Sequence, residues 1–386
     1  MRFSGAVSFL QICGMGIYVH VPFCRSKCHY CGFYSVASFR YREEWVNAVC
    51  REARLRKDYA GTEAAASLYF GGGTPSVLSF EEIKTVKDCL AEVFRLLPGA
   101  ENTIEVNPDD VDSGKAEGWR ALGFNRASVG IQSFSTAVLK GIGRKHSPET
   151  AVKAVEILYR SGFRNISADL MIGLPGQRLE DVLEDVRMVS ALPLTHISVY
   201  MLGLDEGSIF YKKYGKGMLE LPEEETVAEE YTGICDNLEA LGFEHYEISN
   251  FAKPDMYSRH NTAYWEGRNY VGLGPGAHSY DGNSRQWNTA DIRKYTEGVE
   301  KGYGFYEKEI LGPENRFNEY VMTRLRQAKG MAAAEAELLF PDAFAGLKRR
   351  VDAYVRSGHM KADKGRMTMT RKGWLISDDI FVSLFI

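Results

Sequence analysis

The chain has 386 residues, which predicts one large α/β domain with a smaller appendage. Hydrophobic residues make up 45% and charged residues 25%, a balance that excludes a disordered or fibrous chain. A net charge of −4 provides no overall positive potential to attract nucleic acid. Seven cysteines, an odd number in a chain of this length, do not indicate a disulfide framework.

The start of the chain raises the question of a membrane span, because no Asp, Glu, Lys or Arg lies between Phe3 and Cys24. A glutamine, a histidine, a proline and several glycines interrupt this stretch, and no clear cleavage site for a signal peptide follows. We expect residues 1–15 to be a dispensable tail, with Met15 as an alternative start.

From residue 16 to residue 203 the sequence alternates buried strands with amphipathic helices. The expected strands are apolar on both faces and rich in β-branched or aromatic residues, as in a covered parallel sheet. They are Ile17–Val21, Ser67–Phe70, Thr103–Val106, Ala127–Ile131, Ile166–Leu170 and His196–Met201. The helical runs between them are Tyr41–Tyr59, Phe80–Leu97, Val111–Leu122, Pro148–Ser161 and Leu179–Leu192. Such βα units with right-handed crossovers predict an α/β fold, either an open doubly wound sheet or an incomplete barrel.

The remainder of the chain is expected to form an irregular extension over residues 204–305 and a C-terminal domain over residues 306–386. The extension ends in a linker near Asn288–Tyr306. The C-terminal helical runs are followed by a hairpin around Asp363-Lys364-Gly365, which predicts a mainly helical, winged-helix-like domain. Its helical runs are Asn315–Gln327, Ala333–Leu339 and Ala343–Arg356. Acidic residues are mixed into this domain, which argues against DNA binding.

In either architecture a ligand binds at the carboxyl ends of the parallel strands. Turn-forming and polar residues follow every expected strand, as a ligand-binding face requires. They are Phe23-Cys24, Gly71–Pro75, Asn107-Pro108, Gln132-Ser133, Met171–Gly176 and Leu202-Gly203.

Three cysteines after the first strand, Cys24, Cys28 and Cys31, form a C-x3-C-x2-C motif. Thiolates at this spacing on one loop reach three corners of an iron–sulfur cubane and leave one iron open for a non-protein ligand. A zinc site would need a second cysteine pair, which the sequence lacks. His29 is either a fourth ligand or an exposed loop histidine.

The other four cysteines are scattered along the chain, and the last three lie in helical runs, where we expect core residues. They are Cys13, Cys50, Cys89 and Cys235. This usage favours a reducing, cytoplasmic compartment with metal or redox chemistry.

The cysteine motif at this position resembles that of the radical S-adenosylmethionine (SAM) superfamily. In that superfamily the three cysteines hold a 4Fe-4S cluster, and SAM chelates the open iron before its cleavage to a 5′-deoxyadenosyl radical. The resemblance implies that Tyr30 borders the adenine and that the turn Gly71–Thr74 binds the amino group of SAM. It also implies an incomplete (β/α)6 barrel.

Five segments narrow the resemblance to the oxygen-independent coproporphyrinogen III oxidase family. They are Tyr18–Cys24, Phe70–Ser76, Glu105–Pro108, Ser128–Phe134 and Asp169–Gly176. By this resemblance SAM contacts come from Tyr18, Gly72, Gly73, Thr74 and Glu105. Contacts to a second SAM come from Gln132, Arg144 and Asp169, with Gly203 as a further contact position. From the residues alone, Glu105 and Asp169 are also explained as buried carboxylates paired with Arg126 or Arg144.

Two features separate the chain from the oxidase. Phe33 stands where the oxidase has an additional cysteine, and little sequence precedes Cys24 where the oxidase has a long arm. The segment His260–Trp265, which reads H-N-x-x-Y-W, resembles the radical SAM heme chaperones instead, as do Tyr246–Ala252 and Tyr270–His278.

The chemistry of this motif suits heme. His260 offers an imidazole for iron, Asn261 is placed to orient its other ring nitrogen, and Tyr264 and Trp265 offer flat apolar surface for a porphyrin. A histidine beside aromatic residues is otherwise a packed core residue. For His278 both a ligand-facing and a structural role stay open.

The resemblance implies a chaperone that binds heme, a 4Fe-4S cluster and SAM, and delivers heme to hemoproteins such as respiratory enzymes. The alternatives are coproporphyrinogen III oxidase and another radical SAM enzyme unrelated to heme. Peripheral membrane contact through the recipient and a homodimer are compatible with this interpretation, and no nucleic-acid partner is expected.

Overall fold

The structure is a computed structural model that describes residues 14–59, 61 and 64–386. Residues 1–13 of the expected tail, which include Cys13, lie outside the described residues. Met15 is already part of the first strand and is buried.

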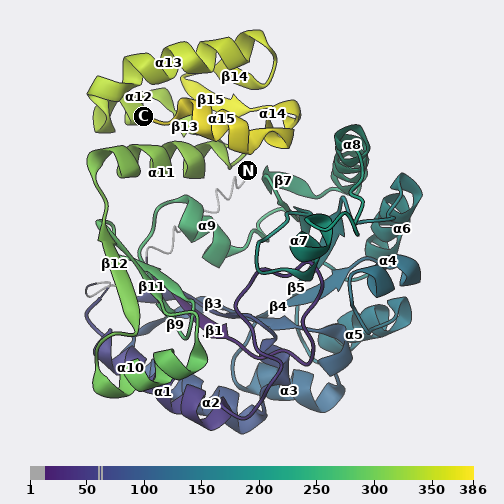
Figure 1. Ribbon diagram of the computed structural model, residues 1–386, viewed down its shortest axis with the longest axis vertical. Coiled ribbons are helices and arrows are strands. Elements are labelled where there is room, and N and C mark those ends of the chain that lie inside the picture. The colour runs from purple at the N-terminus through teal and green to yellow at the C-terminus, as the bar shows by residue number, and fades with distance from the viewer. Residues whose placement is uncertain (1–13, 60, 62–63) are drawn as a thin grey trace, which may run out of the picture.

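A twelve-stranded sheet organises the molecule, and its six central strands run parallel, as predicted (Figure 1). These strands are β1 (Met15–Val21), β2 (Ala65–Gly72), β3 (Leu96–Val106), β4 (Arg126–Gln132), β5 (Asn165–Ile172) and β6 (His196–Met201). The strand order is β12-β11-β10-β9-β1-β2-β3-β4-β5-β6-β8-β7. Because β1 and β6 do not pair with each other, the barrel is incomplete.

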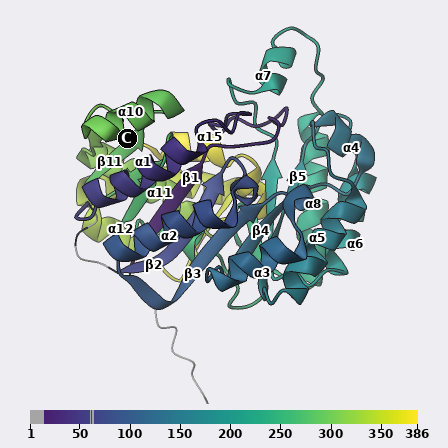
Figure 2. The same ribbon diagram turned by 90° about the horizontal axis from the view of Figure 1, so that it is seen from below.

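Five helices in the predicted positions cover the outer face of the parallel strands (Figure 2). They are α1 (Arg42–Leu55), α2 (Phe80–Val93), α3 (Ser113–Ala121), α5 (Pro148–Arg160) and α6 (Leu179–Ser190). Ser79 and Glu82 form a reciprocal capping box that begins α2. The short helix α4 (Thr136–Gly141) escaped prediction because six residues are too few to show a helical period.

The segment expected to be irregular is mostly regular, so that prediction was wrong. Its elements are α7 (Ile209–Tyr214), α8 (Glu224–Ala240), β7 (Glu244–Glu247), β8 (Asn250–Ala252), α9 (Arg259–Trp265), β9 (Tyr270–Leu273), β10 (His278–Tyr280), β11 (Ser284–Asn288) and α10 (Ile292–Lys301). Strands of three to five residues show too little alternation to be recognised in a sequence. They lengthen the barrel sheet at both edges, where β8 pairs with β6 and β9 with β1.

The expected linker near Asn288–Tyr306 was also wrong, because α10 occupies most of it. Asp291 caps this helix by accepting hydrogen bonds from two backbone amides. The chain then enters β12 (Tyr306–Ile310), which pairs with β11 and completes the sheet.

The C-terminal part has its own core and a three-stranded antiparallel sheet in the order β13-β15-β14, as a winged-helix-like prediction requires (Figure 1). Its elements are α11 (Pro313–Leu325), β13 (Met331–Ala332), α12 (Ala333–Leu339), α13 (Pro341–Arg356), β14 (Met360–Asp363), β15 (Arg366–Met369), α14 (Arg371–Leu375) and α15 (Ser377–Leu384). An ion pair of 2.6 Å between Arg326 and the buried Glu247 ties it to β7. Among the described residues, no helix combines the length and apolarity needed to cross a membrane.

Candidate functional site

The three motif cysteines lie half-buried on the loop that leaves β1. This loop is held against the barrel, since the amide of Cys24 donates to Val36 and the hydroxyl of Thr74 lies 3.4 Å from the Cys24 Sγ. Cys50, Cys89 and Cys235 are buried core residues, as predicted.

His29 lies on the same loop but does not line the pocket of the cysteines. Its Nδ1 lies 2.9 Å from the carbonyl oxygen of Gly141, and its ring contacts Phe210. These contacts fix the loop against α4 and α7, a role that neither sequence alternative described.

A pocket of about 420 Å³ opens at the carboxyl ends of the parallel strands and contains all three cysteines. Nearly every residue predicted to contact SAM lines it, although these residues come from the six parallel strands and the loops that follow them. They are Tyr30, Gly72, Gly73, Thr74, Glu105, Gln132, Arg144, Asp169 and Gly203. Tyr18 is the exception and lines a neighbouring pocket. We refer to the first of these as the cluster pocket.

The glycine turn of the cluster pocket passes directly over β1. Gly72 has a φ of +103°, and a Cβ there would lie 2.4 Å from the His20 ring. A Cβ on Gly73 would lie 2.7 Å from the carbonyl oxygen of Val21. The turn therefore needs glycine for its own packing, independent of any ligand.

Glu105 is half-buried at the end of β3 and is satisfied by neutral groups. The hydroxyl of Tyr69 donates to it over 2.8 Å, and the amide of Gly72 donates over 3.1 Å. Burial raises the pKa of Glu105 to about 7, against the lowering effect of these two hydrogen bonds. This carboxyl group therefore changes charge near neutral pH.

Asp169 faces the same space from β5. The hydroxyl of Ser128 donates to it over 3.2 Å. Burial raises the pKa of Asp169, whereas Ser198 and the charges of Arg126 and Arg144 lower it. Hydroxyl groups thus donate hydrogen bonds to this carboxylate, and the two arginines act on it only through their charge. The expected ion pair with an arginine is not formed.

Gln132 is one of few non-glycine residues with a positive φ, at +70°, and the register of β4 against β5 shifts beside it. Such a conformation is costly for a side chain other than glycine and is typical of functional sites. Arg144 is half-buried beside it and donates to the carbonyl of Gly130 over 2.9 Å. This hydrogen bond ties the Arg144 side chain to the backbone of β4.

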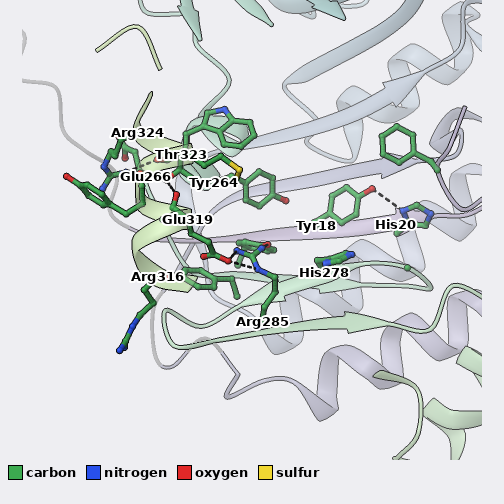
Figure 3. Close-up of a pocket in the computed structure, with 18 of the residues that line it drawn as sticks. Tyr18, His20, Tyr264, Glu266, His278, Arg285, Arg316, Glu319, Thr323 and Arg324 are labelled. Atoms are coloured by element: carbon green, nitrogen blue, oxygen red, sulfur yellow. Dashed lines mark hydrogen bonds and ion pairs between the residues drawn. The ribbon is translucent and has the colours of Figure 1, made fainter. Parts of the chain in front are cut away.

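A second pocket, of about 640 Å³, lies next to the cluster pocket, and the exposed Phe33 lines both. Aromatic side chains from β1 and the loop after it, from α9, β9, β10 and α11, and from the junction of α12 and α13 form its walls (Figure 3). They are Tyr18, Tyr34, Tyr264, Trp265, Tyr270, Tyr280, Tyr320 and Phe340. We refer to this space as the aromatic pocket.

The H-N-x-x-Y-W motif forms α9 on the wall of the aromatic pocket. His260 is buried there, and its Nδ1 lies 2.7 Å from the Ser67 hydroxyl while its Nε2 lies 2.8 Å from the Tyr264 hydroxyl. Its backbone amide donates to Glu101. Both ring nitrogens are thus engaged within the protein, which joins α9 to β2.

Asn261 does not orient the imidazole as expected, because Ser67 and Tyr264 do so. The backbone amide of Asn261 instead donates to the Ser258 hydroxyl at the start of the helix. Trp265 does line the aromatic pocket, and its carbonyl accepts hydrogen bonds from Arg324 and Gln327. The motif therefore also holds the C-terminal part in place.

Several residues of the aromatic pocket were missed by sequence reasoning. Tyr270, Tyr280 and Arg285 lie on β9, β10 and β11, where Arg285 donates to Tyr270 and pairs with Glu319. Their strands are too short to predict. The one available signal was the density of tyrosine after residue 264.

A partial parallel barrel with three loop cysteines at its carboxyl edge defines a radical SAM protein. The radical SAM superfamily matches residues 18–189, and the HemN C-terminal domain matches residues 311–376. Heme chaperone HemW of Bacillus subtilis is 33% identical over 369 residues, which cover 94% of this chain and 97% of that protein. Heme chaperone HemW of Escherichia coli is 30% identical over 384 residues, which cover 96% of this chain and 98% of that protein. The chain belongs to the HemW family.

The fold is shared with coproporphyrinogen III oxidase (HemN) from Escherichia coli, a radical SAM enzyme. The two structures superpose with a TM-score of 0.84 over 97% of this chain and 91% of that one, at 23% sequence identity. Radical S-adenosyl methionine domain-containing protein 1 of Mus musculus, a mitochondrial protein, is 30% identical to this chain and covers 95% of it.

Proposed function

We propose that this protein is a heme chaperone that binds heme, a 4Fe-4S cluster and SAM, and delivers heme to hemoproteins such as respiratory enzymes in the cytoplasm. The observation that carries this proposal is the aromatic pocket, with Tyr264 and Trp265 of the family motif on its wall. Its volume of about 640 Å³ suits a cofactor, and its aromatic rings suit a flat porphyrin.

The cluster pocket fits the iron–sulfur group. Cys24, Cys28 and Cys31 are free thiols on one loop, and they line a single pocket. Within the described part of the chain, no three His, Cys, Asp or Glu side chains converge on the position of one metal ion. Three thiols on one loop suit a cubane, in which each cysteine binds a different iron.

The bound cluster would supply the electron that cleaves SAM. The chain itself provides the groups that orient SAM: the ionised form of Glu105 receives a positive amino group, and the backbone of Gly72 and Gly73 allows close approach. Arg144 offers a half-buried positive charge to a carboxylate. We assign Gln132 and Asp169 to the same pocket and Tyr18 to heme.

Coproporphyrinogen III oxidase is the second candidate, because the SAM residues expected for that enzyme also line the cluster pocket. Phe33 weighs against it, since this exposed side chain stands where the oxidase has a further cysteine. A decisive test measures both functions on one sample. The full chain is reconstituted anaerobically, titrated with heme, and assayed with SAM, a reductant and coproporphyrinogen III.

We expect about one heme per chain and no formation of protoporphyrinogen. Trp265→Ala should weaken heme binding, whereas Tyr303→Ala, which removes an exposed aromatic ring outside the pocket, should leave it unchanged. Steady turnover of coproporphyrinogen, or a chain that binds no heme, would overturn the proposal.

A further inference from the structure

Three histidines lie in or behind the wall of the aromatic pocket, and they differ in what their ring nitrogens contact. His20 uses both nitrogens, since its Nδ1 lies 3.1 Å from the Tyr18 hydroxyl and its Nε2 lies 2.8 Å from the Tyr34 carbonyl. His260 also uses both, on Ser67 and Tyr264. A metal can bind either of these imidazoles only if an internal hydrogen bond is broken.

His278 is the third, and among the described residues its imidazole has no hydrogen-bond partner. Its side chain is exposed to the pocket from β10 and lies beside the Trp287 ring, with centroids 6.3 Å apart. Burial and the nearby charge of Arg285 lower the pKa of His278, so the ring is neutral at neutral pH. A neutral imidazole that is free to bind is the form that iron requires.

The sheet directs His278 toward the space that a porphyrin would fill. In an antiparallel pair, residues directly opposite each other point to the same face, and His278 pairs with Trp287 as Tyr280 pairs with Arg285. Figure 3 shows His278, Tyr18, Tyr264 and Arg285 turned toward one space. The imidazole and these side chains therefore line one space, which offers a flat ligand aromatic surface.

The rim of the pocket offers a positive charge for the heme carboxylates. Arg285 is already paired with Glu319 over 2.8 Å, and Arg324 donates to the Trp265 carbonyl. Arg316 on α11 is exposed at the rim, where it extends outward, and no ion pair or hydrogen bond engages it within the described residues (Figure 3). It is the cation best placed to meet a propionate that projects into solvent.

We infer that His278 is the protein ligand of the heme iron, with the porphyrin stacked in the aromatic pocket and a propionate near Arg316. This inference rests on the proposed function and assigns a different residue from the motif histidine. In this arrangement His260 is a positioning residue, which holds Tyr264 and α9 against the sheet.

The test compares His278→Ala with wild type in the full, cluster-loaded chain. Heme-loaded minus heme-free difference spectra remove the cluster absorption, and electron paramagnetic resonance of ferric heme reports a nitrogen ligand. His278→Ala should shift the Soret band and lose the nitrogen-ligand signal, and free imidazole should restore both. Heme affinity should fall by at least about 10- to 100-fold, since loss of a mere partner of a metal-bound histidine already has such an effect.

Matched variants separate a ligand from a structural role. His260→Gln should lower thermal stability yet keep the nitrogen-ligand signal, and His359→Ala in the C-terminal part should change neither. Arg316→Ala should weaken heme binding but leave binding of a heme with esterified propionates unchanged.

The outcomes distinguish this inference from the function beneath it. If wild type binds heme, but His278→Ala keeps the spectrum and His260→Gln loses it, His278 is not the ligand and the chaperone proposal stands. If wild type binds no heme, both the assignment of His278 and the chaperone proposal fail.

Discussion

Glu105 illustrates how a half-buried carboxyl group at a ligand site lowers the stability of the free protein. Its pKa is raised from 4.5 to about 7 by burial, so between these pH values the unfolded chain ionises before the folded one. The contribution of Glu105 to the free energy of unfolding is therefore largest below pH 4.5 and is lost as the pH rises toward 7.

Glu105→Gln should accordingly raise the free energy of unfolding at pH 8 by about 1–3 kcal/mol and change it little at pH 4. Urea unfolding at both pH values measures this difference, with the exposed Glu43→Gln on α1 as the control. The same variant should bind SAM more weakly, because a neutral amide replaces an anion. An equal effect at both pH values would show that Glu105 is not protonated in the folded protein.

Two glycines of the cluster pocket allow a steric test of SAM binding. Gly203 has no positive φ, and nothing lies within 4 Å of a Cβ built there, so Gly203→Val should fold normally and fill ligand space. Gly72→Ala, by contrast, meets His20 in a left-handed backbone and should cost about 1–3 kcal/mol of stability. Calorimetric SAM titration and thermal melting separate the effects. Unchanged SAM affinity in Gly203→Val would move SAM away from this residue.

The cluster pocket could be predicted from sequence largely because its residues follow strands. A motif at the end of each parallel strand reaches a common edge whatever the helices between them, and Cys24, Glu105 and Asp169 converge for this reason. His260 could not be assigned in this way. Its partner Ser67 is 193 residues away in the sequence, and no local pattern reports that contact.

At the scale of elements, the barrel could be predicted from the sequence and its extension could not. The six parallel strands were predictable because each contains a short run rich in apolar, β-branched or aromatic residues between two helical runs. The strands β8 and β9 are stabilised by pairing with β6 and β1, and β10 and β11 continue the sheet from β9. This tertiary effect overrides weak local propensity. The aromatic pocket is built on these short strands, and for that reason its walls stayed hidden in the sequence.

The ion pair between Arg326 and Glu247 connects α11 to the barrel, and its loss should open the aromatic pocket. The Glu247 side chain is fully buried, whereas a quarter of Arg326 is exposed. Arg326→Ala would leave a buried carboxylate without its charge partner, which should cost about 3 kcal/mol. We expect a lower melting temperature, faster proteolysis after residue 310 and weaker heme binding, with the cluster retained.

A second variant separates lost charge from lost packing. Adding Glu247→Gln to Arg326→Ala removes the unpaired charge and should recover part of the stability. The amide can still accept from Ser249, as the carboxylate does over 3.0 Å. If the double variant is as unstable as the single one, packing of Arg326 on Trp265, 4.4 Å from the ring centroid, is the dominant contribution.

At the scale of the whole molecule, the two pockets share a wall but little of their framework. The cluster pocket is formed by the loops after the parallel strands, and the aromatic pocket by the antiparallel edge, α9 and α11. Phe33 is the shared side chain, and 67% of its surface is exposed. Apart from this ring, the two pockets have no lining residue in common among the described residues.

This separation predicts that heme binding does not depend on the cluster. A chain in which Cys24, Cys28 and Cys31 are all replaced by alanine should lose its iron–sulfur absorption and bound iron. It should still bind about one heme, with an affinity within a few-fold of wild type, because none of these cysteines lines the aromatic pocket.

Cys89→Ala, which alters only a buried core thiol, should retain both groups and lose roughly 1–2 kcal/mol of stability. Heme titration and iron analysis on the same samples measure both properties. Loss of heme binding in the triple variant would mean that a thiolate of the cluster loop ligates heme, and the two pockets would then have to be regarded as one site.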